Sequence, residues 1–119
     1  MKWLWVLEDD LELCSLVGYF FELRGYQAVE LNTLNEAWLQ LFFFKQIDAR
    51  KPECVISDFE IGSKTSEEWL LAVRQALPDI DIICLTACQE PGLEERLRRS
   101  RIRFLAKPTR LSEILKLLD

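Results

Sequence analysis

Short apolar runs alternate with segments of helical periodicity along the whole chain. Five runs of four to six residues have the length and composition of strands. They predict strands over residues 3–7, 26–31, 54–57, 81–86 and 102–106. Between them, apolar residues recur three or four positions apart, as they do on one face of a helix. This spacing predicts helices over residues 10–24, 35–46, 66–77, 92–100 and 110–119.

Residues that start or stop helices stand where the pattern changes. Gly25 follows the first helix, and Pro78 follows the third, which Ser66 opens. For the second helix, either Thr33 or Asn35 can act as the N-cap. These signals support the boundaries that the apolar pattern gives.

Strands and helices that alternate one for one predict an α/β domain with a doubly wound parallel sheet of five strands, covered on both faces by five helices. The expected strand order is 2-1-3-4-5, in a flavodoxin-like arrangement. One domain spans residues 1–119. A site in such a sheet is expected at the carboxyl ends of the strands.

Composition narrows the classes of function. The net charge of −5 disfavours direct nucleic-acid binding by this domain. The absence of histidine excludes imidazole bases and ligands. The apolar run over residues 37–44 is far shorter than the ~20 residues of a membrane span, so we expect no membrane association and a cytoplasmic protein.

The four cysteines stand in apolar segments without a CxxC pair. This usage is typical of reduced, buried thiols in a cytosolic protein. A metal or redox site at Cys84 and Cys88 is the less favoured alternative.

Polar side chains gather where the predicted strands end. Acidic residues follow strands one and three, a threonine ends strand four, and a lysine follows strand five. The set is Glu8, Asp9, Asp10, Asp58, Glu60, Thr86 and Lys107. Acids from two neighbouring strands are suited to a hard divalent cation such as Mg²⁺. A carboxylate nucleophile, a cation, a lysine and a hydroxyl together indicate phosphoryl chemistry.

Over its whole length the sequence resembles a response-regulator receiver domain, the phosphate-accepting module of two-component signalling. The matching stretches are "WVLEDD", "VISDFEI", "ICLTA" and "FLAKP". The resemblance implies Asp58 as the phosphoacceptor. It also implies a metal site in which Asp9 and Asp58 bind directly, Glu8 binds through water, and Glu60 offers its main-chain carbonyl.

The resemblance implies further roles near that site. Thr86 and Lys107 would bind the phosphoryl oxygens, Phe104 would be the aromatic switch residue, and the Lys107–Pro108 bond would be cis. The side chain of Glu60 would lie beside the reacting group or point to solvent, and both remain open. Such a domain is not an enzyme beyond promoting its own phosphorylation and dephosphorylation.

Partners follow from the same resemblance. A sensor histidine kinase or a phosphotransfer protein would supply the phosphoryl group. The face formed by residues 92–100, 102–106 and 110–119 would change on phosphorylation and contact a dimer mate or an effector domain.

The loop after Asp58 departs from the family pattern. Receivers commonly have a Met-Pro pair and then an Asp-Gly pair, whereas here Ile61 and Gly62 stand at the first pair and Ser66 at the usual glycine. An unphosphorylated pseudo-receiver that acts as an interaction module is therefore the alternative function. A flavodoxin-like cofactor binder is disfavoured because the acids after strand one would repel phosphate.

The large aromatic residues of the helices and the arginine-rich run are interpreted as structural features rather than as parts of a site. Trp38 and Trp69 are expected to face the core from their helices, as are two of the three phenylalanines at 42–44. The third would be exposed or would pack against a partner. The arginine-rich run at 96–103 is expected to be a solvated helix face.

Overall fold

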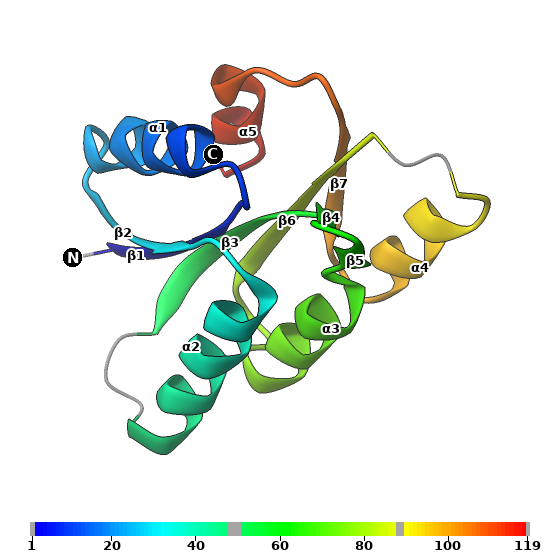
Figure 1. Cartoon of the computed structure of the whole chain (residues 1–119), viewed down its shortest axis with the longest axis horizontal. Helices are drawn as coiled ribbons and strands as arrows, with labels where there is room; N and C mark the ends of the chain where they lie inside the picture. The colour runs from blue at the N-terminus through cyan, green and yellow to red at the C-terminus, as the bar shows by residue number, and fades with distance from the viewer. Residues whose placement is uncertain (1, 48–50, 88–89, 119) are drawn as a thin grey trace.

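The computed structural model describes residues 2–47, 51–87 and 90–118. Five parallel strands form the main sheet in the order β2-β1-β3-β6-β7 (Figure 1). They are β1 (Lys2–Leu7), β2 (Tyr26–Leu31), β3 (Pro52–Asp58), β6 (Asp81–Thr86) and β7 (Arg103–Ala106). Counted along the main sheet alone, this is the predicted order 2-1-3-4-5, so the predicted fold class is confirmed.

Helices cover both faces of the sheet (Figure 1). They are α1 (Leu11–Glu22), α2 (Leu34–Ile47), α3 (Glu67–Ala76), α4 (Leu93–Arg99) and α5 (Leu111–Leu118). α1 and α5 lie on one face, and α2, α3 and α4 lie on the other. Each of the five predicted helices has its counterpart here.

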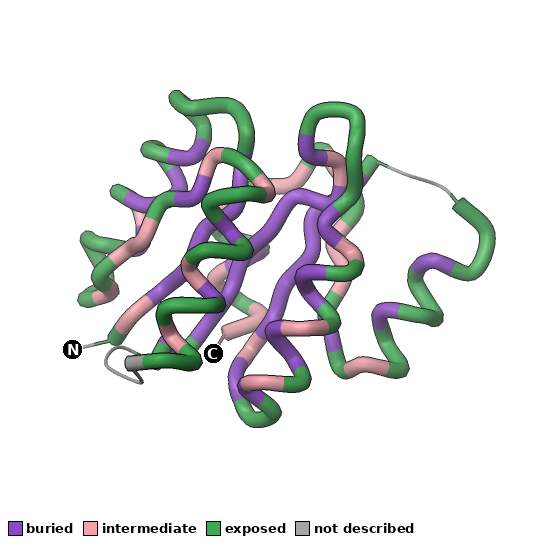
Figure 2. The backbone as a smooth tube through the Cα atoms, turned by 60° about the horizontal axis from the view of Figure 1, so that its bottom comes forward, coloured by how far each residue is buried: buried purple, intermediate pink, exposed green. Residues whose placement is uncertain are grey.

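Alternation along the buried strands divides the core in two. In β1, Leu4 and Val6 pack toward α1 and α5, whereas Trp5 and Leu7 pack toward α2 and α3. Successive side chains of a strand point to opposite faces, so a continuous apolar run supplies both layers. Figure 2 shows the central strands as the most continuously buried part of the chain.

Local signals at the helix ends act mostly as expected. The Thr33 hydroxyl accepts a hydrogen bond from the Glu36 amide at 3.0 Å, which identifies Thr33 as the cap of α2. Gly25 has a φ of 91°, the left-handed conformation that ends α1 without a steric cost. Ser66 precedes α3 but forms no side-chain capping bond, because its hydroxyl is used elsewhere.

The loop after Asp58 contains a short hairpin that the sequence pattern does not predict. Its strands are β4 (Glu60–Ile61) and β5 (Lys64–Thr65), which pair antiparallel. Gly62 has a φ of 62° in the turn between them. Two-residue strands have no periodicity to detect, so the pattern shows only a polar loop.

The predicted burial of α2 is wrong in part. Trp38 is 42% exposed, and Phe42 and Phe43 are also exposed, so only Phe44 of the three phenylalanines packs against the core. The helix buries the stripe that contains Ala37 and Leu41 against the sheet, which leaves its other apolar positions in solvent. The prediction for Trp69 is confirmed, because it is buried.

Three cysteines are free and buried: Cys14, Cys54 and Cys84. Burial raises the pKa of the Cys14 thiol to about 11 and that of Cys84 to about 12. Cys88 lies outside the described residues, so the alternative Cys84/Cys88 site stays untested. Within residues 2–47, 51–87 and 90–118, no helix has the length and apolar character needed to cross a bilayer.

Candidate functional site

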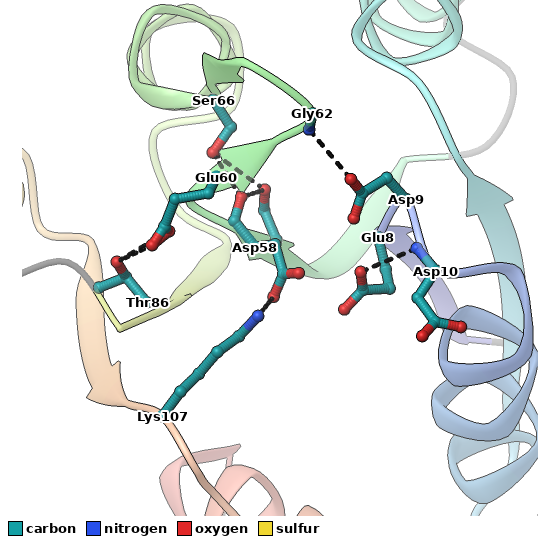
Figure 3. Close-up of polar contacts among 10 residues, drawn as sticks. Glu8, Asp9, Asp10, Asp58, Glu60, Gly62, Ser66, Thr86 and Lys107 are labelled. Atoms are coloured by element: carbon teal, nitrogen blue, oxygen red, sulfur yellow. Dashed lines mark hydrogen bonds and ion pairs between the residues drawn. The ribbon is translucent and has the colours of Figure 1, made fainter.

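Asp58 ends β3 inside the protein, with 4% of its surface exposed. Its Oδ1 atom lies 2.8 Å from Nζ of Lys107, which follows β7 (Figure 3). Oδ1 has no hydrogen-bond partner among the described residues, so this ion pair supplies its compensation. A buried carboxylate requires such a partner, because an isolated charge is costly to remove from water.

Lys107 is held in position by its main chain. Its amide donates to the Thr86 carbonyl at 2.9 Å, and the Lys107–Pro108 peptide is cis, as the resemblance implied. Burial by itself lowers the pKa of Lys107, but the Asp58 carboxylate and its acidic neighbours more than offset this effect. The net result is a raised pKa, so the side chain is a stable ammonium.

Three carboxylates from two adjacent strands meet at this edge of the sheet. One oxygen from each of Glu8, Asp9 and Asp58 can be chosen so that all three lie within 4.8 Å of one another. The pKa of Glu8 is raised to about 8, chiefly by burial and in addition by the neighbouring Asp58. In this arrangement Glu8 holds a proton near neutral pH, because burial and the neighbouring carboxylates both disfavour its charged form.

Main-chain contacts fix the two acids that follow β1. The Glu8 amide donates to the Leu31 carbonyl at 2.9 Å, and the Asn32 side chain donates to the Glu8 carbonyl at 3.0 Å. The Gly62 amide donates to Oδ2 of Asp9 at 3.0 Å, and this bond lowers the pKa of Asp9. Asn32 and Gly62 therefore belong to the site, although no sequence motif predicts a role for either.

Asp10 does not join the carboxylate cluster. Its Oδ1 accepts the Leu13 amide at 3.1 Å, and its side chain caps the first turn of α1. A residue that begins a helix satisfies an amide that would otherwise lack a partner. The third acid of strand one thus has a structural role.

The loop of residues 59–66 is anchored at both ends. The Phe59 amide donates to the Leu85 carbonyl at 2.9 Å, and the Ser66 amide donates to the Phe59 carbonyl at 2.8 Å. The hydroxyl of Ser66 is fully buried and donates to the Asp58 carbonyl at 2.6 Å. Serine at this position therefore ties the start of α3 directly to the strand end that presents Asp58.

Thr86 and Glu60 contact each other across the site. The Thr86 hydroxyl donates to the Glu60 carboxylate, with oxygen distances of 2.8 and 3.1 Å (Figure 3). Of the two orientations that the sequence left open for Glu60, the structure shows the one that faces the site. The role of its main-chain carbonyl as a metal ligand stays a prediction.

Phe104 lies on β7 opposite Cys84 of β6, and Ala106 lies opposite Thr86. The ring is half-buried and packs against the core layer of α2, α3 and α4. Phe104 and Thr86 line the same pocket, together with the first turn of α4. Its position is compatible with the predicted switch role, which stays a prediction.

The oxygen donors of this site suit a hard divalent cation. Glu8, Asp9 and Asp58 offer carboxylate oxygens at close range, and Asp58 Oδ1 is buried with an ion pair as its compensation. Mg²⁺ is usually bound by few carboxylates and keeps several of its water ligands. Two or three carboxylates at this edge of the sheet leave room for those waters. The residues present therefore fit the ion that the sequence predicted.

No protein-family model matches the chain, and no curated protein matches it. Solved structures do match over almost all of it, at low sequence identity. One is a response regulator protein from Burkholderia pseudomallei, whose structure contains a phosphorylated aspartic acid, a calcium ion and citrate. It is 22% identical, with a TM-score of 0.81, and the match covers 100% of this chain and 67% of that one.

Two further structures match at similar levels. The response regulator protein TrrA of Thermotoga maritima, solved with Mg²⁺-BeF, is 22% identical with a TM-score of 0.77, and the match covers 99% of this chain and 96% of that one. The chemotaxis protein CheY4 of Vibrio cholerae is 20% identical with a TM-score of 0.79, at the same coverage. At these identities the likeness establishes the fold. The chain has the fold of the response-regulator receiver domains.

Proposed function

We propose that this protein is a receiver module that accepts a phosphoryl group on Asp58. The observation that carries the proposal is the Asp58 carboxylate, buried at a strand end and paired with Lys107 at 2.8 Å beside two further carboxylates. A structural role alone does not require three acids and one lysine at one sheet edge. The similar proteins that contain a phosphorylated aspartic acid or Mg²⁺-BeF support the same chemistry.

The proposed reaction transfers a phosphoryl group from a histidine nitrogen to a carboxylate oxygen of Asp58. A carboxylate oxygen of Asp58 attacks the phosphorus of a phosphohistidine, an O–P bond forms, and the P–N bond breaks as the imidazole leaves. The product is a mixed anhydride of aspartic and phosphoric acids. Water later attacks its phosphorus, which releases phosphate and restores the carboxylate.

Each side chain has a defined task in this proposal. Asp9 and Asp58 would hold Mg²⁺ directly, Glu8 through water, and Glu60 through its main-chain carbonyl. The bound ion supplies positive charge near the phosphoryl oxygens. Lys107 contributes a fixed ammonium on the other side of Asp58, and the Thr86 hydroxyl donates to a phosphoryl oxygen.

The proposed role is that of a signalling switch in the cytoplasm, with no catalysis beyond its own phosphorylation and dephosphorylation. A sensor histidine kinase or a phosphotransfer protein would be the donor. The outer face of α4, β7 and α5 would change when Thr86 and Phe104 move, and it would contact a dimer mate or an effector domain.

Intact-mass measurement after incubation with acetyl phosphate and Mg²⁺ tests this function. We expect the wild-type protein to gain one phosphoryl group, and the gain to be lost with EDTA or in Asp58→Asn. An unmodified wild-type protein under these conditions would favour the interaction module that is not phosphorylated.

A further inference from the structure

The Thr86 hydroxyl is already engaged in the unphosphorylated protein. It donates to the Glu60 carboxylate, whose two oxygens lie 2.8 and 3.1 Å away. Thr86 is 1% exposed and Glu60 is partly buried, so the contact is shielded from water more than a surface pair would be. A hydrogen bond to a charged acceptor in such a place is among the stronger ones.

The fold directs Glu60 toward Thr86. Ile61 is 6% exposed and packs into the core, and alternation along β4 sends the Glu60 side chain to the opposite side. The Phe59 amide, bonded to the Leu85 carbonyl, keeps the start of the loop beside the end of β6. Figure 3 shows Glu60 reaching across to Thr86 while Asp58 turns toward Lys107.

We propose that Glu60 is a positioning residue that holds the Thr86 hydroxyl in the unphosphorylated state and must release it for Thr86 to bind the phosphoryl group. This inference rests on the function proposed above. A hydroxyl has one proton to donate, so it cannot serve the Glu60 carboxylate and a phosphoryl oxygen at once. The Glu60 carboxylate and the phosphoryl oxygen therefore compete for the Thr86 proton, and the Glu60–Thr86 hydrogen bond favours the unphosphorylated state.

Competition for a hydrogen bond can be separated from simple charge repulsion by two substitutions. Glu60→Gln keeps a side-chain oxygen that can accept the Thr86 proton but removes the charge. Glu60→Ala removes both the acceptor and the charge. The difference between the two variants therefore reports the hydrogen bond to a neutral acceptor, and the difference between wild type and Glu60→Gln reports the charge, including its share of the hydrogen-bond strength.

The test measures labelling rates from acetyl phosphate at saturating Mg²⁺ in both variants, each with Thr86 and with Thr86→Val. We expect Glu60→Gln to label faster than wild type, and Glu60→Ala to exceed Glu60→Gln by roughly three- to tenfold, the range of a net hydrogen bond to a neutral acceptor. In the Thr86→Val background, the Ala and Gln variants should label at equal rates.

A second readout does not depend on phosphorylation. In NMR spectra of the unmodified protein, Glu60→Ala should shift the Thr86 methyl signal. In Glu60→Gln this signal should stay close to its wild-type chemical shift. Equal labelling of the Ala and Gln variants with Thr86 present would overturn the proposal, as would an Ala–Gln difference that persists in Thr86→Val. Absence of any label on wild type would instead contradict the proposed function.

Discussion

The Gly62 amide donates a hydrogen bond of 3.0 Å to Oδ2 of Asp9, and so joins the turn of the β4–β5 hairpin to the acid after β1. Receivers commonly carry proline at this position, and proline has no amide proton to give. Gly62 therefore supplies a donor that a proline at this position could not. Its effect is to orient Asp9 and to favour its ionised form, because the bond lowers the pKa of that carboxyl.

Replacing Gly62 by proline should weaken Mg²⁺ binding several-fold. The change removes the donor and leaves Asp9 less ordered and less acidic. Gly62 has a φ of 62°, which strains alanine and which proline, fixed at about −65°, cannot adopt. The proline variant therefore loses the donor and alters the turn, whereas Gly62→Ala strains the turn and keeps the amide. Titration calorimetry should show weaker binding in the proline variant than in the alanine variant. Equal affinities would mean that the contact does not organise Asp9.

Glu8 should make the metal-free protein less stable as the pH rises. Its pKa is about 8 in the folded protein against an ordinary value of 4.5, so between these values only the folded state holds the proton. The free energy of unfolding should therefore fall from about pH 4.5 to about pH 8. Urea denaturation in EDTA measures this slope, and Glu8→Gln should flatten it.

With saturating Mg²⁺, the free energy of unfolding should instead rise with pH over this range. The ion competes with the proton on Glu8, so its affinity should rise with pH up to about 8. A wild-type slope in EDTA that matches Glu8→Gln would show that Glu8 is ionised like an exposed acid.

Lys107→Ala should bind Mg²⁺ as tightly as wild type or a few-fold more tightly. Lys107 and the metal are two cations that share the Asp58 carboxylate, and loss of one removes roughly 1 kcal/mol of repulsion toward the other. Phosphorylation of this variant should no longer change the NMR signals of α4 and β7. Lys107→Arg, which keeps the charge, is the control for Mg²⁺ affinity. An unaltered response of α4 in Lys107→Ala would remove this lysine from the mechanism.

Arg74 of α3 is a structural residue whose loss should cost about 2–3 kcal/mol of stability. The residue is 8% exposed, and its guanidinium donates to main-chain carbonyls at both ends of the α3–β6 connection and after α4. Arg74→Met keeps much of the side-chain volume but leaves these carbonyls without a donor. Urea denaturation should show the loss, with the exposed neighbour Gln75→Met near wild type. A stable Arg74→Met would show that water replaces the guanidinium.

The sequence is sufficient to predict the sheet order and the convergence of four ionisable side chains at one edge of the sheet. Parallel strands bring their carboxyl ends to one edge, so Glu8, Asp9, Asp58 and Lys107 could be placed together from their positions after predicted strands. The buried strands carry unbroken apolar runs, so they can be recognised from the sequence despite their short length.

The remaining features depend on geometry that single residues do not encode. The Gly62 donor is a main-chain amide, which nearly every residue has, so no letter of the sequence distinguishes it. The Glu60–Thr86 contact requires the hairpin that aims Glu60. Trp38 was misplaced because α2 is apolar around most of its circumference, and periodicity then indicates no single buried face.

Borohydride trapping of the phosphorylated protein identifies the residue that carries the phosphoryl group. Hydride reduces an aspartyl phosphate to homoserine, so the modified residue can be located by mass spectrometry of proteolytic peptides. We expect homoserine at position 58 alone, present only after incubation with both acetyl phosphate and Mg²⁺. Homoserine at position 9, or an unmodified Asp58 in every peptide, would show that Asp58 is not the phosphoacceptor.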